Sequence, residues 1–146
     1  MLARRYEPGA VYRPHIDGAW PGSGLTDGLQ YKYDFFGDRW SRLTFLIYLN
    51  GQNAPGEAEG VDDSASGFDG GCTTFFLPSA QPGWIDAAAV VPTAGCALVF
   101  PHGEAAGSLL HEGSAVTRGA KFVIRTEVLY RTDHAAANMP VMVDAS

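Results

Sequence analysis

The sequence predicts an all-β domain, a sandwich or barrel built from short strands. The 146-residue chain contains 18 glycines and nine prolines, and these turn formers separate short apolar runs in a way that is typical of many short strands. The helix signal is poor throughout. Hydrophobic residues make up 46% of the chain, and the length is that of one domain able to bury its own core.

Six segments have the composition and bounding turns of strands. In chain order they are residues 11–17, 42–50, 71–78, 87–91, 95–100 and 121–130. Because side chains alternate along a strand, Thr44, Leu46 and Tyr48 share one face of the second segment. That face carries a hydroxyl group at each end, so we expect it to line a pocket.

Two long loops and a tail complete the chain. Residues 18–28 are dense in turn formers and carry Trp20, which either forms the rim of a substrate pocket or caps the core. Residues 51–70 are acidic and lack a hydrophobic period, which favours a tolerated insertion over a lid. Residues 132–146 are weakly patterned and are expected to form a loosely packed tail after a core of residues 1–131.

Charge and composition restrict the partners. The net charge of −6 argues against a duplex nucleic acid, although it also simply favours solubility. The longest apolar run, residues 45–49, is far shorter than the ~20 residues that cross a bilayer. The first five residues lack the apolar stretch of a signal peptide, so a cytoplasmic (intracellular) location is expected. Cys72 and Cys96 lack metal-type spacing and are expected to be reduced thiols, with Cys96 in the core.

A histidine and an aspartate two positions apart suggest a metal site. On a strand, His15 and Asp17 leave the same face. A distant histidine, His111, would complete a 2-His-1-carboxylate triad, which holds non-haem Fe(II) and leaves coordination positions open. His102 is an alternative third ligand, but it lies in a Pro-His-Gly turn, where histidines are usually solvated. His134 lies past the last strand and is a weaker alternative still.

The spacing beyond His111 adds a second feature, because Lys121 follows it by ten residues and begins a strand. With this lysine, the chain from about Arg5 to Tyr130 resembles the Fe(II)- and 2-oxoglutarate-dependent dioxygenases of the prolyl 4-hydroxylase type. Further landmarks occur in the family's order: the Arg-Tyr-x-Pro-Gly segment with Tyr6, the Tyr-Leu-Asn of residues 48–50, the paired glycines with Thr-Thr-Phe at residues 70–75, and residues 92–100. One departure is Cys72, which stands where the family usually has glutamate.

The resemblance implies a double-stranded β-helix (jelly-roll) core. Family members usually precede the first motif with helices and strands, so the chain is expected to be a minimal version or a fragment. The implied iron ligands are His15, Asp17 and His111. The resemblance implies Lys121, Tyr48 and Tyr6 as co-substrate residues, and strand alternation adds Thr44 and Arg125. Lys121, with Tyr48 as its partner, is expected to hold the far carboxylate of 2-oxoglutarate. Arg125 shares the strand face of Lys121 but is expected nearer the mouth of the barrel, paired with Glu127 or with a substrate or co-substrate carboxylate.

The implied activity is hydroxylation of a substrate by O2, coupled to decarboxylation of 2-oxoglutarate to succinate and CO2, with ascorbate as reductant. Peptidyl proline is the first expected substrate, and other protein side chains and small molecules stay open. The alternative is a degenerate or truncated jelly-roll module that binds metal without oxygenase activity. A cupin-like enzyme that does not use 2-oxoglutarate is disfavoured, since it has no need for Lys121.

Overall fold

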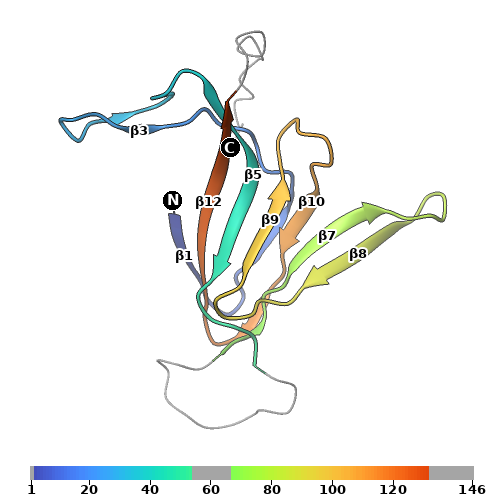
Figure 1. The fold of residues 1–146 in the computed structure, drawn as a ribbon. Helices are drawn as coiled ribbons and strands as arrows, with labels where there is room; N and C mark the ends of the chain where they lie inside the picture. Colours follow the sequence, from blue (N-terminus) through green and yellow to red (C-terminus); the bar gives the residue numbers. More distant parts are fainter. Residues whose placement is uncertain (1, 54–66, 132–146) are drawn as a thin grey trace.

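The structure is a computed structural model that describes residues 2–53 and 67–131. These residues form twelve strands and no helix (Figure 1), which confirms the all-β prediction. Within these ranges there is accordingly no helix long and apolar enough to cross a membrane. Most of the acidic loop predicted at residues 51–70, and the tail predicted at residues 132–146, lie outside the described residues.

Two four-stranded antiparallel sheets make up most of the fold, and neither is closed into a barrel. The first sheet contains, in spatial order, β1 (Leu2–Tyr6), β12 (Lys121–Arg131), β5 (Arg39–Tyr48) and β9 (Ala97–Pro101). The second contains β2 (Tyr12–His15), β10 (Leu110–Gly113), β7 (Thr73–Pro78) and β8 (Ile85–Val90). Two small pairs complete the fold: β11 (Val116–Arg118) with β6 (Asp69–Gly70), and β3 (Gly24–Leu25) with β4 (Tyr31–Lys32).

The six predicted strand segments all contain strands, with ends shifted by up to three residues. The segment predicted at residues 42–50 is β5, and the one predicted at residues 121–130 is β12. The segment predicted at residues 11–17 ends earlier, since β2 stops at His15 and Asp17 lies just beyond it. Sequence analysis missed β1, whose residues pair along their whole length with β12.

The register of β5 against β12 defines the inner face of the first sheet. Tyr48 lies opposite Val123, and Thr44 lies opposite Glu127. Directly opposite residues point to the same side of a sheet. The alternation predicted for both strands is therefore present, and Lys121, Val123 and Arg125 line one pocket together.

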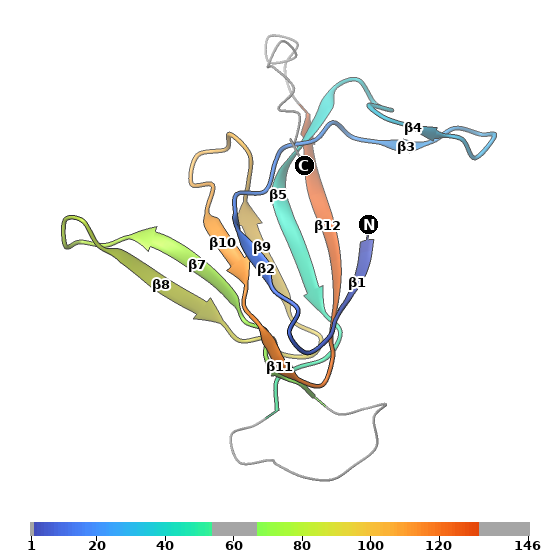
Figure 2. The same cartoon turned by 180° about the vertical axis from the view of Figure 1, so that it is seen from behind.

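The two sheets meet at a small aromatic core. Phe75 on β7 and Phe100 on β9 contact edge to face, with ring centroids 5.0 Å apart. Phe100 also packs on His111, at 4.7 Å between centroids. Figure 2 shows the two sheets lying close together near β11 and diverging away from it. Cys96, predicted in the core, is instead exposed, because the turn before β9 leaves its side chain outside the packed sheets.

The paired glycines before β7 adopt a backbone that other residues disfavour. Gly70 and Gly71 have φ values of +74° and +66°, in the left-handed region. A Cβ on Gly70 would also lie 2.3 Å from the carbonyl oxygen of Ala115. The turn therefore requires glycine twice, and it brings the Gly71 carbonyl to the side chain of Lys121.

Candidate metal centre

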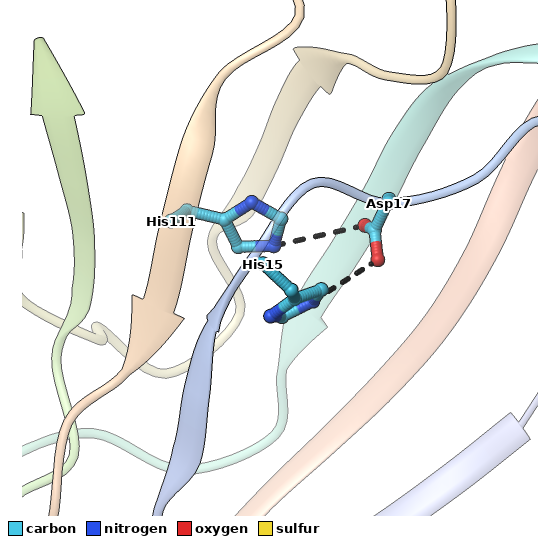
Figure 3. Close-up of side chains that lie close together, drawn as sticks. All are labelled: His15, Asp17 and His111. Atoms are coloured by element: carbon cyan, nitrogen blue, oxygen red, sulfur yellow. Dashed lines mark ion pairs between the residues drawn. The ribbon is translucent and has the colours of Figure 1, made fainter. Parts of the chain in front are cut away.

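Two histidines from different parts of the chain face each other across the second sheet. His15 on β2 lies directly opposite His111 on β10 in the antiparallel register. Their ring centroids are 4.3 Å apart, and both rings point toward Asp17, as Figure 3 shows. The strand pairing thus produces the convergence that the sequence predicts.

Asp17 supplies the carboxylate from the segment after β2. Its backbone carbonyl accepts a 2.7 Å hydrogen bond from Gly103 N–H, and only 6% of the residue is exposed. Oδ1 lies 3.2 Å from His15 Nε2, and Oδ2 lies 3.7 Å from His111 Nε2. Adjacent ligand atoms about 2.1 Å from one shared ion are about 3 Å apart. The three side chains, each offering one ligand atom within 4.8 Å of the others, need only a small contraction to share an ion.

The hydrogen bonds of the two histidines fix the nitrogen that faces the cluster. His15 Nδ1 lies 2.7 Å from Arg13 O, and His111 Nδ1 lies 3.0 Å from Leu109 O. A carbonyl only accepts, so each Nδ1 carries the proton and donates it. Each Nε2 then faces Asp17 and, when it is unprotonated, offers its lone pair to a metal ion.

The Asp17 carboxylate favours positive charge in the cluster, supplied either by protons or by a metal ion. Burial alone lowers the pKa of His15, but the nearby Asp17 carboxylate and the Arg13 carbonyl outweigh it and raise the pKa. Burial lowers the pKa of His111. Burial opposes ionisation of Asp17, yet His15, Thr44 and Arg125 hold its pKa well below the ordinary value. His15 Nε2 is buried without a well-aligned hydrogen bond, so a shared proton or a metal ion would satisfy it. The residues present therefore fit a divalent metal.

Arg125 contacts the metal-ligand cluster itself. Its guanidinium nitrogen lies 2.9 Å from Asp17 Oδ1 and 3.4 Å from Glu127 Oε1. The predicted pairing with Glu127 is present, but the shorter contact is with Asp17. The side chain crosses the face of the sheet toward β2, which strand spacing alone does not reveal.

Lys121 is a buried cation without a carboxylate partner among the described residues. It is 5% exposed and donates a 2.6 Å hydrogen bond to Gly71 O. Its ammonium lies 5.7 Å from the ring centroid of Tyr6 and 5.3 Å from that of Tyr48. Burial lowers the pKa of Lys121 to about 8. A cation held this way is suited to an anion that enters the pocket.

The other residues predicted for the co-substrate have different surroundings. Tyr6 lines the pocket. Tyr48 is 2% exposed, and its hydroxyl bonds Thr73 Oγ1 at 2.8 Å, so it lies behind Thr73, which does line the pocket. The hydroxyl of Thr44 bonds Asp17 and His102, which leaves it no free donor for a co-substrate.

Sequence analysis missed two contributors to this pocket. Arg4 on β1 lines it beside the ring of Tyr12, with the guanidinium carbon 5.5 Å from the ring centroid. Thr73 was noted only as part of a family landmark. Arg4 could have been found from its position two residues before Tyr6, which puts both side chains on one face of a strand. The few apolar residues of β1 hid the strand itself.

His102 also departs from expectation. As a turn histidine it was expected to be solvated, but it is 1% exposed. Its ring bonds Thr44 and Ser41, and it is not part of the three-residue cluster. Packing of the turn after β9 against β5 removes it from water.

Together, fold and site define a class: an all-β protein of two antiparallel sheets whose 2-His-1-carboxylate cluster could hold a divalent metal ion. No protein-family model matches the chain, and no curated protein matches it either.

Proposed function

We propose that the protein is an Fe(II)- and 2-oxoglutarate-dependent oxygenase of the prolyl 4-hydroxylase type. The observation that carries the proposal is that two features share one pocket. The first is the cluster of His15, Asp17 and His111, and the second is the buried Lys121, which has no carboxylate partner among the described residues. The first feature fits a metal with open coordination positions. The second fits an anionic group at a distance from the metal.

The charge of the pocket supports a dianionic co-substrate. The chain has only ten lysines and arginines and a net charge of −6, yet Arg4, Lys121 and Arg125 line this single pocket. Asp17 and Glu112 are the acidic residues in the same lining. A divalent ion would add two positive charges, which 2-oxoglutarate would offset.

The order of strands supports the finer fold assignment, a jelly roll. Along the chain, the eight longer strands pass from one sheet to the other at every step except β7 to β8: β1, β5, β9 and β12 belong to one sheet, and β2, β7, β8 and β10 belong to the other. Eight strands that cross repeatedly between two antiparallel sheets are typical of a jelly roll.

In the proposed reaction each residue has a defined task. His15, Asp17 and His111 would hold Fe(II), which when bound supplies the activation of O2 for hydroxylation. Lys121, between the rings of Tyr6 and Tyr48, would bind the far carboxylate of 2-oxoglutarate. Thr73 would contribute a hydroxyl beside it, and Arg125 would orient Asp17 at the metal. Ascorbate is the expected reductant, and a protein, peptide or small molecule, with peptidyl proline first, is the expected substrate.

The test is succinate formation from 2-oxoglutarate in the presence of Fe(II), ascorbate and O2. It is measured first without a substrate, because a site of this kind should convert some 2-oxoglutarate to succinate even when no substrate is hydroxylated. It is then measured with proline-containing peptides. Wild type should form succinate. Asp17→Asn should not, while Asp86→Asn, an exposed aspartate on β8, should behave as wild type. Fe(II) binding without any succinate in either format would instead support the alternative, a metal-binding module without oxygenase activity.

A further inference from the structure

A buried chain of hydrogen bonds extends from Asp17 away from the metal cluster. Thr44 Oγ1 donates to Asp17 Oδ2 at 2.6 Å and lies 2.8 Å from His102 Nδ1. His102 Nε2 lies 2.9 Å from Ser41 Oγ. Ser41 Oγ in turn accepts a 2.8 Å hydrogen bond from Trp20 N–H.

The number of protons on these groups fixes which one donates and which one accepts in each hydrogen bond of the series. Thr44 Oγ1 donates to Asp17 Oδ2, so its one hydroxyl proton points at the carboxylate. Thr44 Oγ1 must then accept from His102, which places the histidine proton on Nδ1. A neutral His102 has a lone pair on Nε2, which accepts the hydroxyl proton of Ser41. Every donor therefore points toward Asp17, and burial lowers the pKa of His102, consistent with the neutral ring.

The side chains that form this series of hydrogen bonds are withdrawn from water. Ser41 and Thr44 are 0% exposed and His102 is 1% exposed. Water cannot replace a lost partner at such positions, and leaving a buried polar group unpaired is costly. Each side chain is thus constrained by the next.

A β-bulge places the two hydroxyl residues of β5 on the same face. Residues three positions apart on a regular strand point to opposite faces. Here Leu43 pairs with Val128 and Ser41 pairs with Leu129, which leaves Arg42 without a partner on β12. The bulge turns Ser41 to the side of Thr44, and the carbonyl of Arg42 accepts a 3.0 Å hydrogen bond from His102 N–H. A bulge beside a functional site commonly redirects a side chain.

We infer that His102 is a positioning residue of the metal centre, which acts through Thr44 to hold the Asp17 carboxylate in its metal-binding orientation. This rests on the metal-binding part of the proposed function and does not depend on 2-oxoglutarate. His102 does not touch the metal. Its removal would free the Thr44 hydroxyl to rotate, and the carboxylate would lose a fixed donor.

The test is the affinity for Co²⁺ alone, followed by the visible d–d absorption of the bound ion. His102→Leu removes both ring nitrogens at similar size, and we expect a Kd about 10–100-fold weaker, the usual effect of losing a partner that orients a ligand. His102→Asn keeps an N–H donor near the position of Nδ1 and should restore most of the affinity. Thr44→Val should weaken binding as His102→Leu does.

The double variant separates positioning from general structural damage. If His102 acts through Thr44, His102→Leu should cost no further affinity in the Thr44→Val background. Additive losses, wild-type affinity in His102→Leu, or an Asn variant as weak as the Leu variant would overturn the inference. If His102→Leu does not fold, Thr44→Val and the Asn variant decide the question.

A second measurement uses the wild-type protein without metal. The nitrogen NMR shifts of His102 at neutral pH should show the neutral ring protonated at Nδ1, and an imidazolium or an Nε2-protonated ring would overturn the inferred direction. Failure of wild type to bind Co²⁺ would overturn the proposed function as well. Normal wild-type binding and turnover with unaffected His102 variants would overturn only the role of His102.

Discussion

His15 and His111 lie directly opposite each other across the β2–β10 pair, with ring centroids 4.3 Å apart. Each ring is held at Nδ1 by a backbone carbonyl two residues earlier in its own chain segment. The strand pairing therefore sets the separation of the two Nε2 atoms before any ion binds, and the entropic cost of assembling the site falls largely on folding.

Loss of the negative charge of Asp17 should strongly weaken metal binding and leave the fold intact. Asp17→Asn keeps the size of the side chain but removes its charge, so Co²⁺ affinity should fall by about 100-fold or more, beyond the effect of losing a supporting residue. Isothermal titration calorimetry measures the affinity and circular dichroism checks the fold. Asp86→Asn is the matched control. Tight binding by Asp17→Asn would show that the ion, if any, binds elsewhere.

Removal of Lys121 should weaken the interaction with 2-oxoglutarate and spare the metal. Breaking a buried charge pair costs about 3–5 kcal/mol, so Lys121→Met should raise the KM for 2-oxoglutarate by about 100-fold or more. Co²⁺ affinity should stay within a fewfold of wild type. Steady-state kinetics over a range of 2-oxoglutarate concentrations tests this. If Arg125→Met raises that KM and Lys121→Met does not, Arg125 is the anchor.

The buried ammonium should also make stability depend on pH. The pKa of Lys121 is lowered to about 8 in the folded protein, against about 10.4 for an unfolded lysine. Below pH 8 both states are protonated, and the cost of burying the charge is fully present. Between these two values the unfolded state binds more protons, so the free energy of unfolding rises with pH through this term.

Comparison with Lys121→Met isolates that term. Methionine has no charge to bury, so the variant should have a larger free energy of unfolding than wild type near pH 7.5. The difference in this free energy between the two proteins should narrow by about 1–2 kcal/mol by pH 9.5. Urea unfolding at a series of pH values measures both proteins. A constant difference would indicate that Lys121 keeps an ordinary pKa.

The turn before β7 should tolerate no side chain at its first glycine. Gly70 and Gly83 both have positive φ, +74° and +82°, so alanine brings a similar backbone penalty at each. Only at Gly70 would the Cβ collide with a backbone oxygen, that of Ala115. Gly70→Ala should therefore destabilise the protein by about 1–3 kcal/mol more than Gly83→Ala. Equal midpoints in urea unfolding would contradict the close approach of Gly70 to Ala115.

Local rules account for much of what sequence analysis predicted correctly. Alternation along a strand is a property of the backbone, so the shared face of Thr44, Leu46 and Tyr48 followed directly from their spacing. The same rule placed Lys121 and Arg125 on one face of β12. The proximity of His15 to Asp17 was also local. The choice of His111 as their partner came from a family pattern, and the structure brings it into the cluster.

The features that sequence analysis did not predict depend on contacts between distant segments. Cysteine is apolar enough for a core, but the exposure of Cys96 depends on the position of the turn before β9 relative to the sheets. Tyr48 was placed on the correct face, yet its hydroxyl is bonded by Thr73 from the other sheet. Arg125 reaches Asp17 across the sheet rather than only its neighbour Glu127.

By itself, the sequence determined the all-β class, the strand faces and a set of side chains that could bind a metal, because each follows from short-range spacing and side-chain chemistry. Only the tertiary structure decided the role of His102. A turn histidine between proline and glycine is solvated unless another element covers it, and here β5 does so. The bulge at Arg42 directs Ser41 and Thr44 to the two ring nitrogens. Burial and hydrogen bonding of that ring arise from strand pairing between distant segments, which no local pattern encodes.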